Sequence, residues 1–373
     1  IFALRPDLID PDRCIKLQQL YSRGATIPTE DSQNLLQRFA PEGFMSHFKS
    51  LDKEPFAAAS IGQIHRGVLN DGTKVVVKII KADFEASFKR DVRRMKRWIT
   101  IGLFFRRKLR KVGNPIGLLA HIEDYTLREL DLTNEISGRN ELILKASEIE
   151  KNFSMPKLQF PKMWDELSNR HVLVMEEIVH PTLEQHLEEG TLSWPDMLEL
   201  FRIHGAFMFG IGTFHGDLHP GNAMMDDKGN FIFIDTGAIC NAPDHVRNAL
   251  FGFFYFLAKG ELRHAYDAML TMADVQPTGK TLQTYYDSMN ELYDGFVGTS
   301  VSEVSLTEQM MKTVKAAVLA GCSFGEEAFP IIRSLMYMDG MVLKGHPEVD
   351  LISSMGPYLD EFSVLIDPHS IIK

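Results

Sequence analysis

The pattern of apolar and polar positions divides this 373-residue chain into stretches that predict different elements. Residues 1 to about 50 mix the two kinds of position as helices do, and Pro28 ahead of an acidic turn indicates a helix start. Two runs rich in β-branched residues, 59–69 and 74–80, flank an Asn-Asp-Gly turn and predict a β-hairpin. The chain is therefore expected to open with helices and then to change to strands.

Helices are predicted for most of the remaining chain. Residues 84–150 have a mostly helical pattern, and 172–176 is predicted to be a short buried strand. From Thr182 onward helices dominate, interrupted by a Gly/Pro-rich loop and an apolar strand at 231–235. The longest apolar run, Ala249 to Ala258, is shorter than the roughly 18 residues that span a bilayer, so it predicts a buried helix.

This order of elements predicts an α+β fold of the bilobal protein-kinase-like type with an N-terminal helical extension. A hairpin ending in lysine, a helix, a strand and then a helical half with spaced Asp and Asn residues is the order found in two-lobed kinases. We expect three regions: a helical extension at 1–52, an N-lobe with an Ala-rich loop at 53–180, and a mainly helical C-lobe with the catalytic loop at 181–373.

The most specific chemical signal is the loop FHGDLHPGN at 214–222. Asp217 is followed five residues later by Asn222, which is the spacing of a kinase catalytic loop, and the strand eighteen residues on ends at Asp235 in an Asp-x-Gly segment. We expect Asp217 to act as a base or to orient a reacting hydroxyl. Asn222 and Asp235 are expected to hold Mg²⁺ on the phosphates of ATP. The alternative is a solvated Asp in a turn.

Two histidines, His215 and His219, flank the predicted base. We interpret them as side chains that pack and hydrogen-bond to hold the loop in shape. The alternative is a metal site, but no third soft ligand lies nearby in the sequence.

Further candidates lie in the predicted N-lobe. Lys78 ends an apolar strand, as does the kinase lysine that reaches the α- and β-phosphates. Glu176 and Ile178 fall where backbone groups would meet adenine. The position of a Gly-rich phosphate loop is taken by residues that restrict the backbone where glycines would free it: Ala57, Ala58, Ala59 and Ser60.

Together these residues resemble the UbiB/AarF-type atypical kinase-like family, whose members support coenzyme Q and other isoprenoid-lipid metabolism in bacteria, mitochondria and plastids. The resemblance runs from about residue 12 to about residue 260. The loop string at 215–222 is shared with aminoglycoside- and choline-kinase-like phosphotransferases. The Ala-rich loop, continued by Gly62-Gln63-Ile64-His65, and the Glu-x-Asp at 129–131 distinguish the family from them.

The resemblance implies a pairing and a regulatory contact. Glu135, on the long helix of the N-lobe, is expected to pair with Lys78. Glu129 and Asp131 form the family's Glu-x-Asp motif. In the family this motif faces an N-terminal Lys-x-Gly-Gln segment, which lies over the active site and occludes protein substrates.

The sequence departs from the family pattern at two positions. The N-terminal segment keeps Lys16 and Gln19 but has Gln18 where glycine is expected. Thr236 stands where phenylalanine is usual in the Asp-Phe-Gly segment. The packing that sets active and inactive states in protein kinases is therefore not expected to transfer directly.

Charge is distributed unevenly along the chain. The net charge is −10, yet residues 89–111 carry eleven Lys/Arg and one acid, which leaves −20 elsewhere. So acidic a remainder argues against general nucleic-acid binding. Basic flanks around an apolar centre at 98–105 suit an anionic membrane surface or lipid, so we expect peripheral membrane association. The alternatives are a helix packed on the N-lobe and docking to an acidic protein partner or RNA.

The expected activity is that of a Mg²⁺-dependent ATPase or phosphotransferase. Two alternatives stay open: a small-molecule phosphotransferase of the aminoglycoside or choline type, and a catalytically weak nucleotide-binding scaffold in a larger assembly. The chain opens on Ile1 rather than Met, so we expect a preceding piece that would carry any targeting peptide. The sequence does not distinguish mitochondrion, plastid and bacterial cytoplasm.

Overall fold

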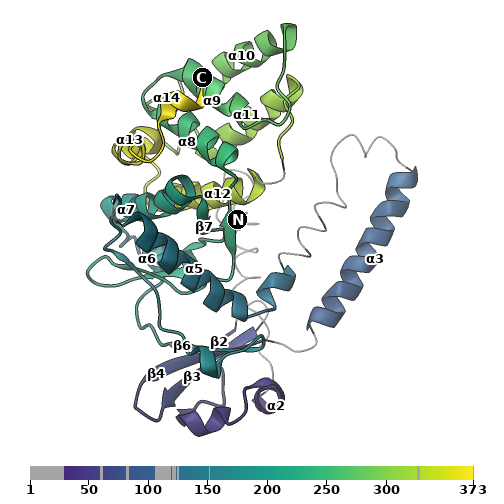
Figure 1. Cartoon of the computed structure of the whole chain (residues 1–373), viewed down its shortest axis with the longest axis vertical. Coiled ribbons are helices and arrows are strands. Elements are labelled where there is room, and N and C mark those ends of the chain that lie inside the picture. Colours follow the sequence, from purple (N-terminus) through teal and green to yellow (C-terminus); the bar gives the residue numbers. More distant parts are fainter. Residues whose placement is uncertain are drawn as a thin grey trace.

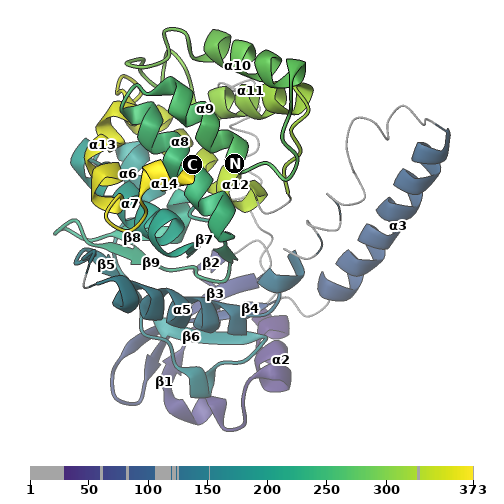
Figure 2. The same cartoon turned by 45° about the horizontal axis from the view of Figure 1, so that its top comes forward.

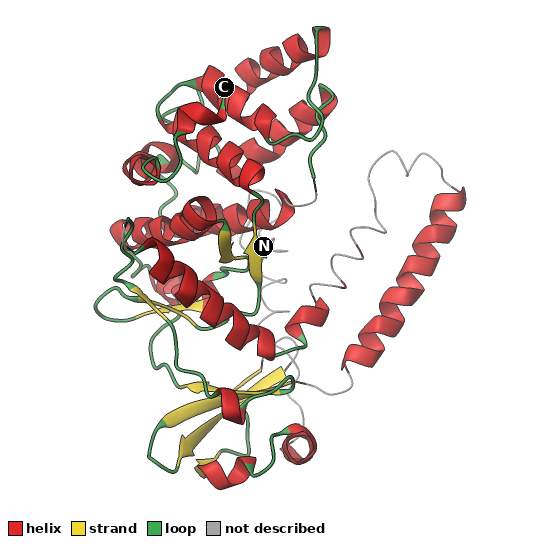
Figure 3. Cartoon of the chain, in the orientation of Figure 1, coloured by secondary structure: helices red, strands yellow, loops and turns green. Residues whose placement is uncertain are grey.

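The computed structural model describes residues 29–58, 62–80, 84–105, 119, 123, 126–150, 152–325 and 328–372. The predicted regulatory pair Lys16 and Gln19, and Ala59 and Ser60 of the Ala-rich loop, lie outside the described residues. Within the described part, a strand-rich region and a helical region occupy opposite ends of the molecule (Figures 1 and 3).

A five-stranded antiparallel sheet forms the strand-rich region. Its order is β1-β3-β4-β6 with β2 paired to β3, and its strands are Phe48–Leu51 (β1), Ala57–Ala58 (β2), Gly62–Leu69 (β3), Lys74–Ile80 (β4) and Val172–Glu176 (β6). The predicted hairpin is β3–β4, turned at Gly72 with a φ of 89°, and the predicted strand at 172–176 is β6. Because the sheet begins at Phe48, the last residues predicted as a helical extension are a strand instead.

Strand β4 is buried on both faces, which accounts for its run of β-branched residues. One face packs toward α2 (Thr29–Phe39), and the other packs toward the start of α5 (Thr133–Ile149). Side chains alternate along a strand, so Lys78 shares the second face with Val76 and Ile80. This alternation aims the predicted phosphate lysine at α5 and the helical region.

The helical region is built from helices and two small sheets. Strand β7 (Thr213–His215) pairs with β10 (Ile239–Asn241), and β9 (Phe231–Phe233) lies between β5 (Leu158–Gln159) and β8 (Ala223–Met225). The helices that follow β6 are α6 (Leu183–Glu189), α7 (Trp194–Gly205), α8 (Asp244–Ala258), α9 (Leu262–Thr271), α10 (Lys280–Tyr293), α11 (Leu306–Leu319), α12 (Ala328–Gly345), α13 (Leu351–Phe362) and α14 (Pro368–Ile371).

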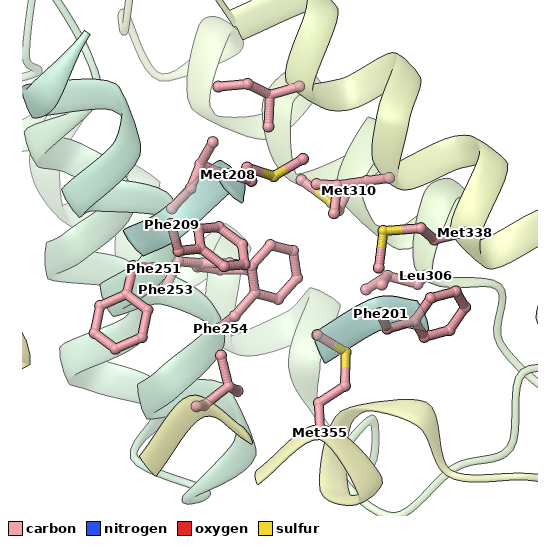
Figure 4. Close-up of a cluster of buried hydrophobic side chains, with 14 of the residues drawn as sticks. Phe201, Met208, Phe209, Phe251, Phe253, Phe254, Leu306, Met310, Met338 and Met355 are labelled. Carbon is pink, nitrogen blue, oxygen red and sulfur yellow. The ribbon is translucent and has the colours of Figure 1, made fainter. Parts of the chain in front are cut away.

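The core of this region forms around α8, the buried helix predicted from the longest apolar run. The rings of Phe251 and Phe254 on α8 each lie 6.1 Å from the ring of Phe209. Figure 4 shows these residues on one side of a buried cluster and Leu306 and Met338 of the later helices on the other. A helix that is apolar on nearly every side is stable only when it is surrounded, which is its situation here.

Helix α3 (Phe84–Phe105) projects away from both regions (Figures 1 and 2). Val92 is fully buried, but Trp98 is 72% exposed, Met95 45% and Ile101 42%. Trp98 and Ile101, of the apolar centre predicted at 98–105, are therefore exposed, which disfavours the alternative that this centre packs on the N-lobe. No helix among the described residues is both long and apolar enough to cross a membrane.

A buried histidine should make stability depend on pH. His204 on α7 is fully buried, its Nε2 lies 2.5 Å from Ser334 Oγ on α12, and burial, aided by His215, lowers its pKa from 6.5 to about 3. Below about pH 6.5 the unfolded chain therefore binds a proton that the folded chain excludes, so acid favours unfolding. We predict that His204→Gln loses part of the fall in stability between about pH 6 and pH 4.

Urea unfolding of wild type and variant across this pH range measures the effect. The variant should show a slope smaller by up to one proton. His180→Gln, which changes an exposed histidine, is the control and should keep the wild-type slope. Equal slopes for His204→Gln and wild type would contradict the prediction.

Candidate functional site

Three elements bring charged side chains together beside the sheet. Lys78 of β4 places its Nζ 2.5 Å from Glu135 Oε1 on α5 and 3.3 Å from Asp235 Oδ2, just after β9. The Glu135 side chain is 6% exposed and that of Lys78 14%, whereas Asp235 is 37% exposed. The structure thus brings the predicted lysine, its expected helix partner and a predicted metal ligand into one cluster.

Electrostatics favour the charged forms of Lys78 and Asp235 in this cluster. Burial alone would lower the pKa of Lys78, but Asp235 and Glu135 outweigh burial and raise it, so the lysine is protonated at neutral pH. Burial also acts on Asp235, yet Lys78 holds its pKa below the usual value. Burial and the nearby Asp235 raise the pKa of Glu135, against the pull of Lys78. A permanent positive charge beside an ionised carboxylate suits the binding of phosphate and a cation.

Thr236 ties the Asp-x-Gly segment to α5. Its backbone N–H donates to Glu135 Oε2 at 2.9 Å, and its hydroxyl donates to the backbone oxygen of Glu135 at 2.7 Å. One turn further along α5, a Cβ added to Gly138 would lie 1.9 Å from the Thr236 carbonyl oxygen. Threonine at the usual phenylalanine position therefore makes a polar fit to the helix, and glycine allows the two backbones to touch.

The predicted catalytic loop follows β7 and is held by its own backbone and side chains. Asn222 Nδ2 donates to the Asp217 backbone oxygen at 2.9 Å and lies 3.5 Å from Asp217 Oδ2. The Asn222 carbonyl accepts from Ile234 N at 3.0 Å, which links the loop to the residue before Asp235. This arrangement brings Asp217, Asn222 and Asp235 to one side of the helical region.

His215 and His219 hold the loop in this arrangement. His215 Nδ1 accepts from Asp217 N at 3.2 Å, so its Nε2–H is the donor to the backbone oxygen of Asp235. His219 Nδ1 accepts from Gly221 N at 3.0 Å. Burial lowers the pKa of both rings, that of His219 to about 4, so both are neutral at physiological pH.

The donor set fits Mg²⁺ carried on a nucleotide better than a metal held by protein alone. Among the described residues, no group of three or more His, Cys, Asp and Glu is placed to hold a metal ion. Mg²⁺ is usually bound by one or two protein oxygens together with phosphates and water. Asn222 and Asp235 could supply those protein oxygens, and the phosphates would supply others.

Other predicted residues have local partners. Ala57 and Ala58 form β2 beside β3, at the start of the Ala-rich loop. Glu176, at the end of β6, accepts from Lys162 N at 3.1 Å through its carboxylate, and Ile178 is half-buried just beyond it. The predicted contacts of the Ala-rich loop with phosphate, and of the backbone at Glu176 and Ile178 with adenine, stay predictions.

The Glu-x-Asp motif lies immediately before α5. Asp131 Oδ1 accepts from the Thr133 hydroxyl at 2.6 Å and from Thr133 N at 3.1 Å, so this carboxylate supports the start of the helix that carries Glu135. Glu129 is half-buried in the helical turn just before it. The predicted contact of this motif with Lys16 and Gln19 falls outside the described residues.

One residue at the site escaped the sequence reasoning. The hydroxyl of Tyr337, on α12, donates to Asp217 Oδ1 at 2.7 Å. The two residues are 120 positions apart. No spacing or motif connects them, and only the tertiary packing of α12 brings them together.

Comparison with known proteins places this arrangement in a class. A solved structure of Rv3197 from Mycobacterium tuberculosis, in complex with erythromycin, superposes with a TM-score of 0.58 at 17% identity, covering 98% of this chain and 90% of that one. The model of the ABC1 atypical kinase-like domain matches residues 19–269. The chain therefore belongs to the ABC1 atypical kinase-like family, which confirms the family expected from the sequence.

Curated relatives agree at low identity. A probable protein kinase UbiB of Marinobacter nauticus is 24% identical over 393 aligned residues, covering 100% of this chain and 68% of the relative. An uncharacterised protein of Clostridium pasteurianum, from the 5′ region of hydrogenase 1, is 23% identical, covering 96% and 66%. The chain thus spans about two thirds of the length of the curated relatives it matches.

The contact between α5 and the Asp-x-Gly segment gives a testable prediction. Gly138→Ala places a methyl group against the Thr236 carbonyl oxygen, a backbone atom that cannot move away alone. We predict a loss of about 1–3 kcal/mol in the free energy of unfolding. The control is Gly356→Ala on α13, where an added Cβ meets nothing within 4 Å and should be neutral or stabilising.

Urea unfolding of both variants checks this prediction. Equal stability of Gly138→Ala and Gly356→Ala would show that α5 and the segment at Thr236 are not in close contact in solution.

Proposed function

We propose that this chain is a Mg²⁺-dependent ATP-binding enzyme of the atypical kinase type, acting as an ATPase or phosphotransferase. The observation that carries the proposal is the Lys78–Glu135–Asp235 cluster facing the Asp217–Asn222 loop. In this proposal the strand-rich region is the N-lobe and the helical region the C-lobe of a bilobal fold.

The side chains divide the work by position and charge. Lys78, fixed by Glu135, holds phosphate oxygens as a constant positive charge. Asp217 orients the hydroxyl of an acceptor or of water and accepts its proton. Asn222 and Asp235 hold Mg²⁺, which neutralises charge on the phosphates when bound. Catalysis here is mainly positioning, because phosphoryl transfer asks for little covalent chemistry from the protein.

The acceptor is proposed to be a small or lipid-linked molecule, in support of isoprenoid-quinone or lipid metabolism. The support is the Ala-rich loop, the Glu-x-Asp motif and the relatives named as probable protein kinases UbiB. A catalytically weak nucleotide-binding scaffold is the rival from another class. Measurable turnover of ATP that is lost in Asp217→Asn favours the enzyme over the scaffold.

We further propose that the segment 89–111 attaches the protein peripherally to an anionic membrane surface. The described part of this segment lies on α3, where the exposed Trp98 stands among cationic side chains. Each Lys or Arg near such a surface adds about 1 kcal/mol, and a buried indole adds an apolar contribution. The alternative is that this helix binds an acidic protein partner.

The metal assignment is tested at Asp235. Asp235→Asn removes the charge but keeps the size of the side chain, so Mg²⁺-dependent ATP binding should weaken at least tenfold while the fold is retained. Calorimetry with ATP, with and without Mg²⁺, measures the change. Asp274→Asn, far along the chain after α9, is the control and should bind as wild type does. Unchanged Mg²⁺–ATP affinity in Asp235→Asn rules out the assignment.

The membrane proposal is tested by reversing charge on α3. Arg93→Glu with Arg97→Glu should reduce co-sedimentation with vesicles containing cardiolipin or phosphatidylserine, and the reduction should be largest at low salt. Trp98→Ala should reduce the binding that persists at high salt. The matched control is Lys280→Glu with Lys315→Glu, which changes net charge equally on exposed positions of α10 and α11. Failure of wild type to co-sediment at low salt refutes the proposal.

A further inference from the structure

Helix α12 reaches the predicted base through the side chain of Tyr337. The Tyr337 hydroxyl donates to Asp217 Oδ1 at 2.7 Å, and the tyrosine is 7% exposed. Its ring stands edge-on to His219, with centroids 5.6 Å apart and an interplanar angle of 89°. The phenol is therefore fixed by packing as well as by its hydrogen bond.

The helix that carries Tyr337 is itself anchored on both sides of it. About one helical turn before Tyr337, Ser334 Oγ lies 2.5 Å from His204 Nε2 on α7. Two residues later, the fully buried Asp339 accepts from Ser305 Oγ at 3.0 Å and from Thr307 N at 3.0 Å, at the start of α11. Because α12 is held by two other helices, the backbone that carries the phenol has anchors outside the catalytic loop.

We propose that Tyr337 is a positioning residue for Asp217, and this inference rests on the function proposed for that carboxylate. The charge-assisted hydrogen bond fixes Oδ1 and with it the rotamer of the side chain. The second oxygen, Oδ2, lies on the side of Asn222, and in this proposal it accepts the hydrogen bond from an acceptor hydroxyl or from water. Asn222 alone defines the carboxylate weakly, because its Nδ2 lies 3.5 Å from Oδ2.

The alternative role for Tyr337 is that its hydroxyl, which is hydrogen-bonded to Asp217, accepts the phosphate itself. The surroundings disfavour that role, since the ring is enclosed against His219 and a phosphate there would place negative charge beside Asp217. Phosphorylation of Tyr337 is therefore an outcome that would overturn the inference.

The experiment compares Tyr337→Phe with Tyr285→Phe. The second variant removes another buried tyrosine hydroxyl, which donates to the Tyr266 backbone oxygen at 2.9 Å within the helical region. For Tyr337→Phe we expect kcat for ATP turnover to fall about tenfold or more, with KM and the affinity for Mg²⁺–ATP unchanged. Its Tm should fall no further than that of Tyr285→Phe, which should keep the wild-type kcat.

A second readout does not depend on turnover. In protein labelled at the tyrosine ring carbon that bears the hydroxyl, the Tyr337 resonance is identified by its loss in Tyr337→Phe. It should shift in Asp217→Asn, while the Tyr285 resonance should not. Normal kcat in Tyr337→Phe, no such shift, or phosphate on Tyr337 in wild type by mass spectrometry each overturn the inference. A different result would refute only the proposed function. In that case the Tyr337 resonance shifts in Asp217→Asn, but the wild-type protein neither binds Mg²⁺–ATP nor turns over ATP.

Discussion

The rest of the site depends on one buried lysine held between two carboxylates. Lys78 contributes one positive charge, while Glu135 and Asp235 bring two acidic groups to the same place. Burying unbalanced charge is costly, so the cluster depends on good geometry and on hydrogen bonds to its carboxylates, such as the one from Thr236 N to Glu135. The neutral His215 does not supply a second positive charge, although its ring contacts the Asp235 backbone. A cation carried on a nucleotide would complete the balance.

Several distant parts of the chain serve this cluster. The alternation along β4 points Lys78 toward α5, and Gly138 lets α5 approach the Asp-x-Gly segment closely. The catalytic loop reaches the same segment through the backbone bond from Ile234 to Asn222. Each connection is a short contact that ties the site to elements of the packed core.

Local patterns in the sequence predicted what is local in the structure. The hairpin, the strand at 172–176 and the apolar helix α8 follow from periodicity and turn residues, and the motif spacing brought together Asp217, Asn222 and Asp235. Contacts set by tertiary packing left no such signal. Tyr337 approaches Asp217 only because of where α12 packs, and the exposure of α3 depends on where its neighbours lie. The strand that begins at Phe48 was not predicted, because this short segment directly follows residues with a helical pattern.

The fit between Thr236 and α5 bears on how such a protein could be controlled. In protein kinases the phenylalanine of the equivalent segment can leave its place, and its packing sets active and inactive states. Thr236 has no ring to withdraw, and both its hydroxyl and its amide are committed to Glu135. Turning the segment would break two buried hydrogen bonds without opening an aromatic-sized hollow. A segment held in this way favours control through the access of ligands over control by turning the segment.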